Sequence, residues 1–289
     1  MEDNQISIVI PAYNEENAIA ESIQSVNQVM SETNFTYEVI VVDDGSTDRT
    51  TEFARKEQAI VINLDRNMGY GAALKAGVRR SEYNTIVIID ADGTYPIDMI
   101  PVLSRELGEY DMVVGARTGD QVDVALARAP AKWFLKKLAG YLAGQHIPDL
   151  NSGMRVIRKP LLKRFFHLLP QGFSFTTTIT LASLCSDSLV RYIPINYYKR
   201  VGTSKIRPFH AIEFLLLIIR TVVYFNPLKV FLPLGTLFFV GGLIKFIYDV
   251  YIGNFSETAL LGFISAIVFW AIGLLSDQIS KIALRSDNL

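Results

Sequence analysis

The chain has 289 residues, a formal net charge of -1 and a mean hydropathy of +0.26. A charge balance this close to neutral argues against a nucleic-acid partner, because nucleic-acid-binding proteins carry a basic excess. The single cysteine, Cys185, excludes an internal disulfide and fits a reducing compartment, where we expect a buried structural thiol. The acidic first residues lack the basic stretch of a signal peptide, so we expect none.

Residues 6–195 alternate short β-branched runs with helical patterns, which is typical of a mostly parallel sheet covered by helices. The expected strands are, in chain order, "ISIVIP", "YEVIVVDD", "AIVINLDRN", "TIVIID" and "YDMVVGAR". Four of them run directly into polar residues. Because ligands of open α/β sheets bind at the carboxyl ends of strands, we expect one pocket at that edge.

Asp90 and Asp92 stand where the fourth expected strand ends. Residues two apart in an extended chain point to the same side, so both carboxylates would face one spot beyond the strand. A divalent cation bound to substrate phosphates would relieve their repulsion, since hard cations take carboxylate and phosphate oxygens. An isolated D-x-D is more often a turn with two solvated acids, so the remaining motifs must decide.

Apolar residues dominate the chain beyond residue 207. Residues 209–225 resemble a helix that lies at a bilayer surface. Residues 230–252 and 259–279 are each about as long as the roughly 20 residues that cross the hydrocarbon of a bilayer. Lys245 and Asp277 interrupt these spans near their ends, where long side chains can reach the interface. The alternative, a buried soluble hairpin, lacks a partner large enough to cover it.

Basic residues precede the first span and follow the second, whereas the connection "GNFSE" has none. Under the positive-inside rule, a two-span membrane protein with this pattern has its N-terminal domain and both termini in the cytoplasm. We therefore expect an α/β domain over residues 1–207, a juxtamembrane amphipathic helix over 208–227, and a transmembrane hairpin with a short tail over 228–289.

Four motifs, "PAYNEE", "VVDDGSTDRT", "NMGYGAALKAG" and "DADGTYP", occur in this order at the strand ends of one domain. Together they resemble the family 2 glycosyltransferases of the GT-A fold, and more narrowly the polyisoprenyl-phosphate glycosyltransferases, which include dolichol-phosphate mannose synthase. The resemblance covers roughly residues 6–205, and the two spans match a membrane-anchored subgroup. It implies a mostly parallel sheet flanked by helices.

The resemblance also implies a nucleotide-sugar site. Asp44 would lie near the nucleoside, Asp43 would support the turn, and Val42 would offer an apolar wall. Tyr13 is as readily a packing residue as a ligand contact, and Lys75 is either near phosphate or solvated. The implied donor-binding residues are Pro11, Ala12, Tyr13, Glu15, Val42, Asp44, Gly71, Lys75, Asp90, Ala91, Asp92 and Lys205.

For the metal, the resemblance implies Mg²⁺ or Mn²⁺ held by Asp90, Asp92 and Thr94, with Asp92 as the principal ligand. Thr94 stands where one form of the motif has a Gln ligand, so its hydroxyl or a water would complete the shell. Arg117 and Arg128 would hold the donor diphosphate and the lipid phosphate, which suits forked donors.

The segment "DLNSGMRVIRK" matches the D-x-x-S-G-x-R segment of the resembled family. This match implies that Asp149 lies close to the acceptor and that Arg155 pairs locally or with Asp149. The implied catalytic residues are Asp92, Arg117 and Asp149. A phosphate monoester is already an anion at neutral pH, so Asp149 would act as a base only for a hydroxyl acceptor.

The implied function is inverting transfer of a sugar from a nucleotide sugar to the phosphate of an undecaprenyl or dolichyl lipid at the cytoplasmic membrane face. A homo-oligomer is possible. The alternatives are transfer to a hydroxyl of a glycolipid or polysaccharide, and an inactive membrane scaffold that binds nucleotide sugars.

Overall fold

The computed structural model of the chain describes residues 4–117, 137–141, 143–172, 174–186, 188–198, 210–254 and 256–286. The α/β domain is built around a seven-stranded sheet in the order β3-β2-β1-β4-β6-β5-β7. Its strands are β1 (Gln5–Ala12), β2 (Thr36–Asp43), β3 (Ile60–Asn63), β4 (Thr85–Ile88), β5 (Met112–Arg117), β6 (Arg155–Arg158) and β7 (Val190–Ile195).

The sheet is mostly parallel, as expected. Strand β6 pairs antiparallel with β4 and β5, whereas the other pairings are parallel. Strands β1 and β4 are buried almost throughout, because helices cover both faces of the sheet. Strands β6 and β7 were not among the five expected strands. The four residues of β6, "RVIR", begin and end with arginine and carry no strand pattern long enough to recognise.

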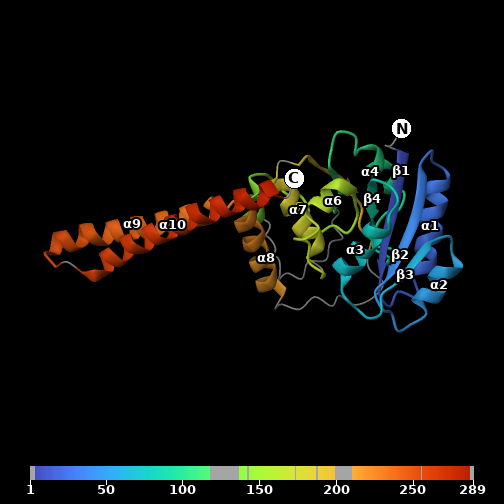
Figure 1. Ribbon diagram of the computed structural model, residues 1–289, viewed down its shortest axis with the longest axis horizontal. Coiled ribbons are helices and arrows are strands. Elements are labelled where there is room, and N and C mark those ends of the chain that lie inside the picture. Colours follow the sequence, from blue (N-terminus) through green and yellow to red (C-terminus); the bar gives the residue numbers. More distant parts are fainter. Residues whose placement is uncertain are drawn as a thin grey trace.

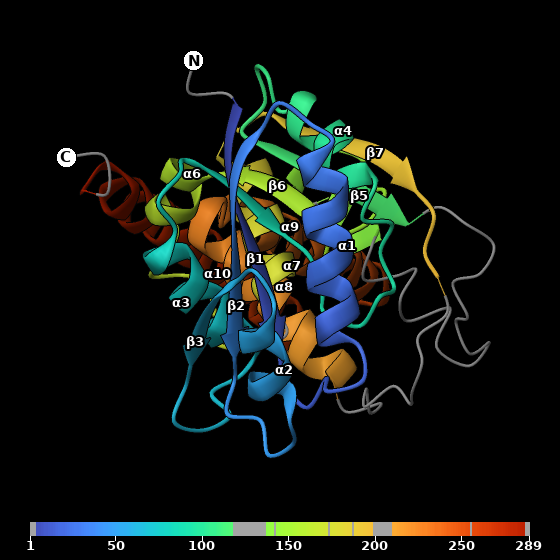
Figure 2. The same ribbon diagram turned by 90° about the vertical axis from the view of Figure 1, so that its right-hand side faces the viewer.

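Two helical layers enclose the sheet (Figure 2). The apolar residues of α1 (Ile19–Ser31), α2 (Thr50–Lys56) and α4 (Met99–Arg105) pack against one face. Those of α3 (Tyr70–Arg80), α6 (Lys159–Arg164) and α7 (Phe175–Cys185) pack against the other. Cys185 lies half-buried at the end of α7, where burial raises the pKa of its thiol to about 11, in keeping with a structural role.

Helix α8 (His210–Phe225) lies across α7 and closes a third apolar cluster. Its residues Ile218 and Val222 are fully buried against Leu181 and Leu184 of α7. Leu216, in contrast, is 60% exposed. The segment expected at the bilayer surface is thus a helix with one face on the globular domain.

Helices α9 (Leu228–Ile252) and α10 (Glu257–Ser286) form a hairpin that projects away from the α/β domain (Figure 1). By length and composition, both are able to cross a membrane. They contact each other through stacked aromatic side chains, such as Phe238 with Phe269 at 5.2 Å between ring centroids. Most of their large apolar side chains face outward, as lipid-facing residues would.

The charges inside the hairpin are paired within each helix. Lys245 forms an ion pair with Asp249, whose carboxylate also accepts a hydrogen bond from Ser256 N at 3.1 Å. Lys281 Nζ lies 2.7 Å from Asp277 Oδ2. Both pairs have i, i+4 spacing. Lys245 and Asp277, which the sequence presents as isolated interruptions, therefore each have a partner one turn away.

Candidate functional site

The carboxyl ends of six parallel strands meet at one edge of the sheet, where the polar motifs gather. Ala12 and Asp43 end neighbouring strands in register, and Arg117 ends β5. Strand β6 runs the other way, so the segment that precedes it arrives at this same edge. The antiparallel strand therefore delivers Asp149 and Gly153 beside the ends of β4 and β5.

The loop after β1 is fastened to the loop after β2. Asn14 adopts a left-handed conformation with φ of 54°, its N–H donates to Ser46 Oγ at 2.9 Å, and its Oδ1 accepts from Thr47 N at 2.8 Å. Pro11 and Ala12 are buried in β1, whereas Tyr13 and Glu15 are half-buried on this loop. The four motif residues thus stand together beside β2, and their contact with a nucleotide stays a prediction.

Asp44 and Asp43 both organise loops. The Asp44 side chain is only 3% exposed, and its oxygens accept from the backbone N–H groups of Met68 at 2.7 Å and Gly69 at 2.8 Å. Asp43 accepts from Ser46 N at 2.9 Å, which agrees with its expected role in the turn. Asp44 therefore ties the glycine-containing loop to β2, and its nucleoside contact stays a prediction.

The glycines of the "GYG" motif pack closely against the backbone of another segment. A Cβ atom on Gly71 would lie 2.2 Å from the carbonyl oxygen of Pro170, so only glycine lets that segment approach. Lys75, four residues on, donates to the carbonyl of Leu169, and its Nζ lies 5.3 Å from the ring centroid of Phe166. Gly71 is among the expected donor-binding residues; in the structure the backbone that approaches it is the segment before α7, and its contact with a donor stays a prediction.

The side chain of Val42 is fully buried in the core beneath α3. A Cβ on Gly77 of α3 would lie 3.3 Å from one of its methyl groups. Val42 thus differs from the expected open wall of a nucleotide pocket, because alternate residues of a strand face opposite sides of the sheet. Ala91 is also buried, and its carbonyl accepts from Ser22 Oγ at 2.9 Å.

Asp90 lies between two tyrosines. Its Oδ1 accepts from Tyr70 Oη at 2.9 Å. Burial, together with the charge of Asp90, raises the pKa of both Tyr70 and Tyr95 above the usual tyrosine value. A Cβ on Gly153 would lie 2.2 Å from Asp90 Oδ2, so a glycine is needed at the closest point of the following loop. Asp90 is therefore held on a rigid, half-buried edge.

Asp92 follows on the same turn and bonds to Thr94. Its Oδ1 accepts from Thr94 Oγ1 at 2.6 Å and from Thr94 N at 3.2 Å. Thr94 is 1% exposed. Asp90 and Asp92 are both half-buried and supply carboxylate oxygens, which fits a hard divalent cation that takes its other ligands from substrate phosphate. Within the described ranges, no group of three His, Cys, Asp or Glu side chains gathers.

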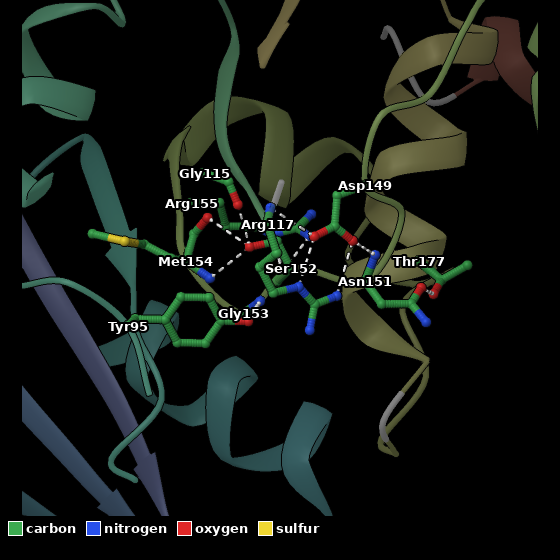
Figure 3. A network of polar contacts seen from close by, with 10 residues as sticks. All are labelled: Tyr95, Gly115, Arg117, Asp149, Asn151, Ser152, Gly153, Met154, Arg155 and Thr177. Atoms are coloured by element: carbon green, nitrogen blue, oxygen red, sulfur yellow. Dashed lines mark hydrogen bonds and ion pairs between the residues drawn. The ribbon is translucent and has the colours of Figure 1, made fainter. Parts of the chain in front are cut away.

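Arg117 and Asp149 form a bidentate ion pair (Figure 3). Asp149 accepts from Arg117 Nε at 2.7 Å, from Nη2 at 2.9 Å and from the backbone N–H at 3.1 Å. Burial raises the pKa of Asp149, but the hydrogen bonds and charge of Arg117 outweigh that effect, so the pKa lies below its usual value. The guanidinium lies 5.3 Å from the Tyr197 ring centroid. The guanidinium plane is thus fixed from two sides.

Arg155 is completely buried and pairs locally, one of the two expected arrangements. It donates to the carbonyl of Ser152 through Nε at 3.1 Å, and through Nη1 to Thr176 O at 3.1 Å and Thr180 Oγ1 at 3.0 Å. Asp149 is taken by Arg117 instead. Arg155 thereby fixes the loop of Asp149 and Gly153 onto α7.

The loop of residues 149–153 connects the part of the site that carries Asp92 to the part that carries Arg117. Gly153 N donates to Tyr95 Oη at 2.6 Å, and Ser152 Oγ donates to Gly115 O at 2.6 Å (Figure 3). These bonds connect the turn of Asp92 to the strand that ends in Arg117. Sequence reasoning missed Tyr70, Tyr95 and Tyr197; only the Tyr within "DADGTYP" and "GYG" offered a signal. Arg128, expected at a phosphate, and Lys205, expected to bind the donor, lie outside the described residues.

Two family descriptions match parts of the chain. Residues 7–166 match Glycosyl transferase family 2, and residues 226–282 match the GtrB C-terminal hairpin. The first match covers the strands that carry the site from β1 through β6. The second covers α9 and most of α10, which confirms the expected pair of apolar C-terminal helices as a unit known in other proteins.

Several curated relatives have a lipid phosphate in their names. A dolichyl-phosphate hexose transferase of Haloferax volcanii is 34% identical over 71% of this chain and 88% of the relative. An undecaprenyl-phosphate 4-deoxy-4-formamido-L-arabinose transferase of Pseudomonas fluorescens is 28% identical over 72% of this chain and 62% of the relative. A third relative is the uncharacterized glycosyltransferase YkcC of Bacillus subtilis. It is 36% identical over 47% of this chain and 44% of the relative.

Solved structures share the fold. Glucosyl-3-phosphoglycerate synthase from Mycobacterium tuberculosis, in complex with Mn²⁺, UDP and phosphoglyceric acid, matches with a TM-score of 0.60 at 21% identity. The match covers 76% of this chain and 78% of the synthase. The same enzyme in complex with Mg²⁺ and UDP matches with a TM-score of 0.59. At this identity the likeness establishes the architecture, a mixed sheet of the GT-A type.

Proposed function

This chain belongs to glycosyl transferase family 2, and on that premise we propose that it transfers a sugar from a nucleotide-sugar donor to the phosphate of a polyprenyl lipid, with inversion at the anomeric carbon. The names of the relatives that act on dolichyl and undecaprenyl phosphate support the acceptor class. The paired helices of the C-terminal hairpin support a place at the membrane, where such lipids reside.

On the donor side, Asp90 and Asp92 would hold the divalent cation, and the loop of Tyr13 and Glu15 would border the nucleotide. When bound, a Mg²⁺ or Mn²⁺ ion supplies positive charge next to the diphosphate, whose oxygens gain negative charge as they leave. Tyr70 donates to Asp90 and so orients that carboxylate before any ligand arrives. Thr94 does the same for Asp92, which makes it an orienting residue as well as a candidate ligand.

The observation that carries the choice of acceptor is the bidentate pair of Arg117 and Asp149. Both oxygens of Asp149 accept from Arg117, and the pKa of Asp149 is lowered, so this carboxylate is a poor general base. A lipid phosphate needs no base, because its second pKa of about 6 leaves it anionic at neutral pH. Asp149 is then a positioning residue that aims the Arg117 fork at a phosphate.

In the proposed reaction, an oxygen of the lipid phosphate attacks the anomeric carbon from the face opposite the diphosphate. A new carbon–oxygen bond forms, the bond to the nucleoside diphosphate breaks, and its electron pair stays on the departing phosphate oxygen. No proton needs to move, because attacking and leaving oxygens are both phosphate oxygens. Displacement from the opposite face inverts the configuration at the anomeric carbon.

We further propose that the hairpin spans the membrane with the catalytic domain and both termini in the cytoplasm, since basic residues flank the spans and the connection lacks them. Helix α8, which precedes the hairpin, is separated from α9 by only two residues. This short connection would keep the domain close to the bilayer surface, where the acceptor phosphate lies.

The experiment presents the purified full chain with a panel of radiolabelled nucleotide sugars and either polyprenyl phosphate or the matching polyprenol. We expect label in the organic phase only with the phosphate. Label transferred to the polyprenol at a comparable rate would favour the hydroxyl-acceptor alternative. No transfer to either lipid, with nucleotide sugar still bound, would favour the scaffold alternative.

A further inference from the structure

A basic pocket lies on the face of the domain formed by α3 and α6. It has a volume of about 310 Å³ and is lined by Val78, Arg79, Lys159, Lys163 and Phe166. The backbone N–H of Lys159 donates to Asn84 O at 2.7 Å, directly before β4. The pocket therefore lies at the amino end of β4, opposite the edge that carries Asp90, and is separate from the proposed catalytic site.

The residues that line this pocket include three cations and no acid, and the acidic charge that acts on Lys159 is that of Glu38. Arg79, Lys159 and Lys163 form no ion pair within the described part of the chain. The Arg79 guanidinium lies 4.9 Å from the ring centroid of Phe166, which holds it against an apolar surface. Burial and the neighbouring charge of Lys163 lower the pKa of Lys159, and they outweigh the charge of Glu38, which acts in the opposite direction. An anion in the pocket would relieve this crowding of like charges.

The pocket is next to the point where the chain leaves the domain for the hairpin. Phe166 stands between Phe165, whose ring centroid lies 5.5 Å from that of Phe225, and His167, whose Nε2 lies 3.4 Å from Tyr224 Oη. Both partners are the last residues of α8, and α9 begins at Leu228.

Helix α10 returns to the same level, because Ser280 Oγ donates to Tyr224 O at 2.5 Å. The two sequence neighbours of Phe166 thus contact the end of α8, which α10 also contacts, and Phe166 itself lines the pocket.

We propose that this pocket binds the phosphate of an anionic phospholipid headgroup, held by Arg79, Lys159 and Lys163 at the membrane surface. The inference rests on the proposed membrane placement of the hairpin. Three cations match a phosphate, and the apolar Val78 and Phe166 match the glycerol and upper acyl region of a lipid. The bound lipid would fix the rotation of the domain on its hairpin.

The test uses the full chain purified in detergent and native mass spectrometry with phosphatidylglycerol or phosphatidylcholine. The variant Arg79→Gln/Lys163→Gln removes two exposed cations and leaves Lys159, which also donates to Ser81 O. The matched control is Arg55→Gln/Arg105→Gln, which removes two exposed cations from the helices on the other face of the sheet. We expect the pocket variant to weaken phosphatidylglycerol binding about tenfold, and the control to leave it unchanged.

A second readout separates lipid from soluble phosphate. The amine of Lys163 is labelled with an acylating reagent in nanodiscs of phosphatidylcholine with or without phosphatidylglycerol, or with added glycerol 3-phosphate. Protection by phosphatidylglycerol alone supports the proposal. Equal protection by glycerol 3-phosphate, or phosphatidylglycerol binding that the pocket variant retains, overturns it.

Sugar transfer is assayed on the same phosphatidylcholine nanodiscs, so that failure of the proposed function is seen separately from failure of lipid binding. Inability of the chain to enter nanodiscs overturns the inference together with the membrane placement.

Discussion

The α/β domain and the C-terminal hairpin use buried acidic residues in different ways. Asp149 pairs with Arg117, 32 residues away, and the pair joins the end of a strand to the loop before another. Asp249 pairs with Lys245 within a single helix and closes the turn of the hairpin through Ser256. In the proposed function, the first arrangement orients the Arg117 guanidinium toward a phosphate. The second neutralises charge where a bilayer would otherwise oppose it.

This difference leads us to expect that acidic residues of the domain control catalysis, and that those of the hairpin control only stability and membrane insertion. Each of the following predictions tests this difference between the acidic residues of the domain and those of the hairpin.

The largest effect is expected for Asp92→Asn, which removes the charge proposed to hold the cation. We expect kcat to fall about 10²–10³-fold or more, because charge stabilisation at the leaving group is lost. The fold should persist, since the substituted amide can still accept from Thr94. Initial rates of sugar transfer and thermal unfolding measure the two effects. The control is Asp98→Asn, an exposed acid six residues further along the chain.

A near-normal rate for Asp92→Asn in the presence of a chelator would show that the reaction does not depend on a cation held by Asp92. A similar loss in Asp98→Asn would mean that the whole turn, rather than one carboxylate, is sensitive.

The second prediction separates stability from activity at the Arg117–Asp149 pair. Arg117→Met leaves Asp149 buried without its partner and should cost about 3–5 kcal/mol in the free energy of unfolding. Arg117→Met/Asp149→Leu should regain most of that stability, because no unpaired charge remains. Neither variant should transfer sugar. Denaturant unfolding and transfer rates are compared, and activity in the double variant would show that the pair is only structural.

Much of the fold was predictable, because it rests on local patterns. Each of these patterns lies in consecutive residues, as in the β-branched runs of β1, β2 and β4 and in the two apolar spans. The joint position of Asp90 and Asp92 follows from one strand end. In the hairpin, the i, i+4 spacing of Lys245 and Asp249 could have been recognised from the sequence, although Lys245 was interpreted there without Asp249.

The parts that could not be predicted depend on contacts between distant residues. Tyr70 meets Asp90 across 20 residues, and Gly153 meets Tyr95 across 58. Nothing in the spacing of either pair indicates the contact. The burial of Arg155 was equally hidden, because an arginine is rarely placed in a core unless carbonyl groups such as those of Ser152 and Thr176 surround it.

The third prediction concerns pH. The pKa of Asp149 is lowered in the folded protein, so this carboxylate contributes stability that is complete above its ordinary pKa of 3.8. That contribution should be lost as the pH falls below 3.8 toward the lower folded-state value. The unfolding temperature of the wild type is measured across this range beside that of Asp149→Asn. An equally steep acid dependence in the variant would assign the effect to other groups.

The smallest effect is expected in the hairpin. Lys281→Gln removes the partner of Asp277, but the lysine side chain is 64% exposed, so stability should change by about 0–1 kcal/mol. Transfer rates should equal those of the wild type. A loss of activity comparable to that of Arg117→Met would show that hairpin charges take part in the reaction, and would erase the distinction between the two regions.

The most direct measurement is proton and phosphorus NMR of the isolated lipid product. Transfer to a phosphate oxygen with inversion predicts an anomeric proton coupled to phosphorus, with the configuration opposite to that of the donor. An anomeric proton without phosphorus coupling, or a product that retains the donor configuration, would contradict the proposed reaction.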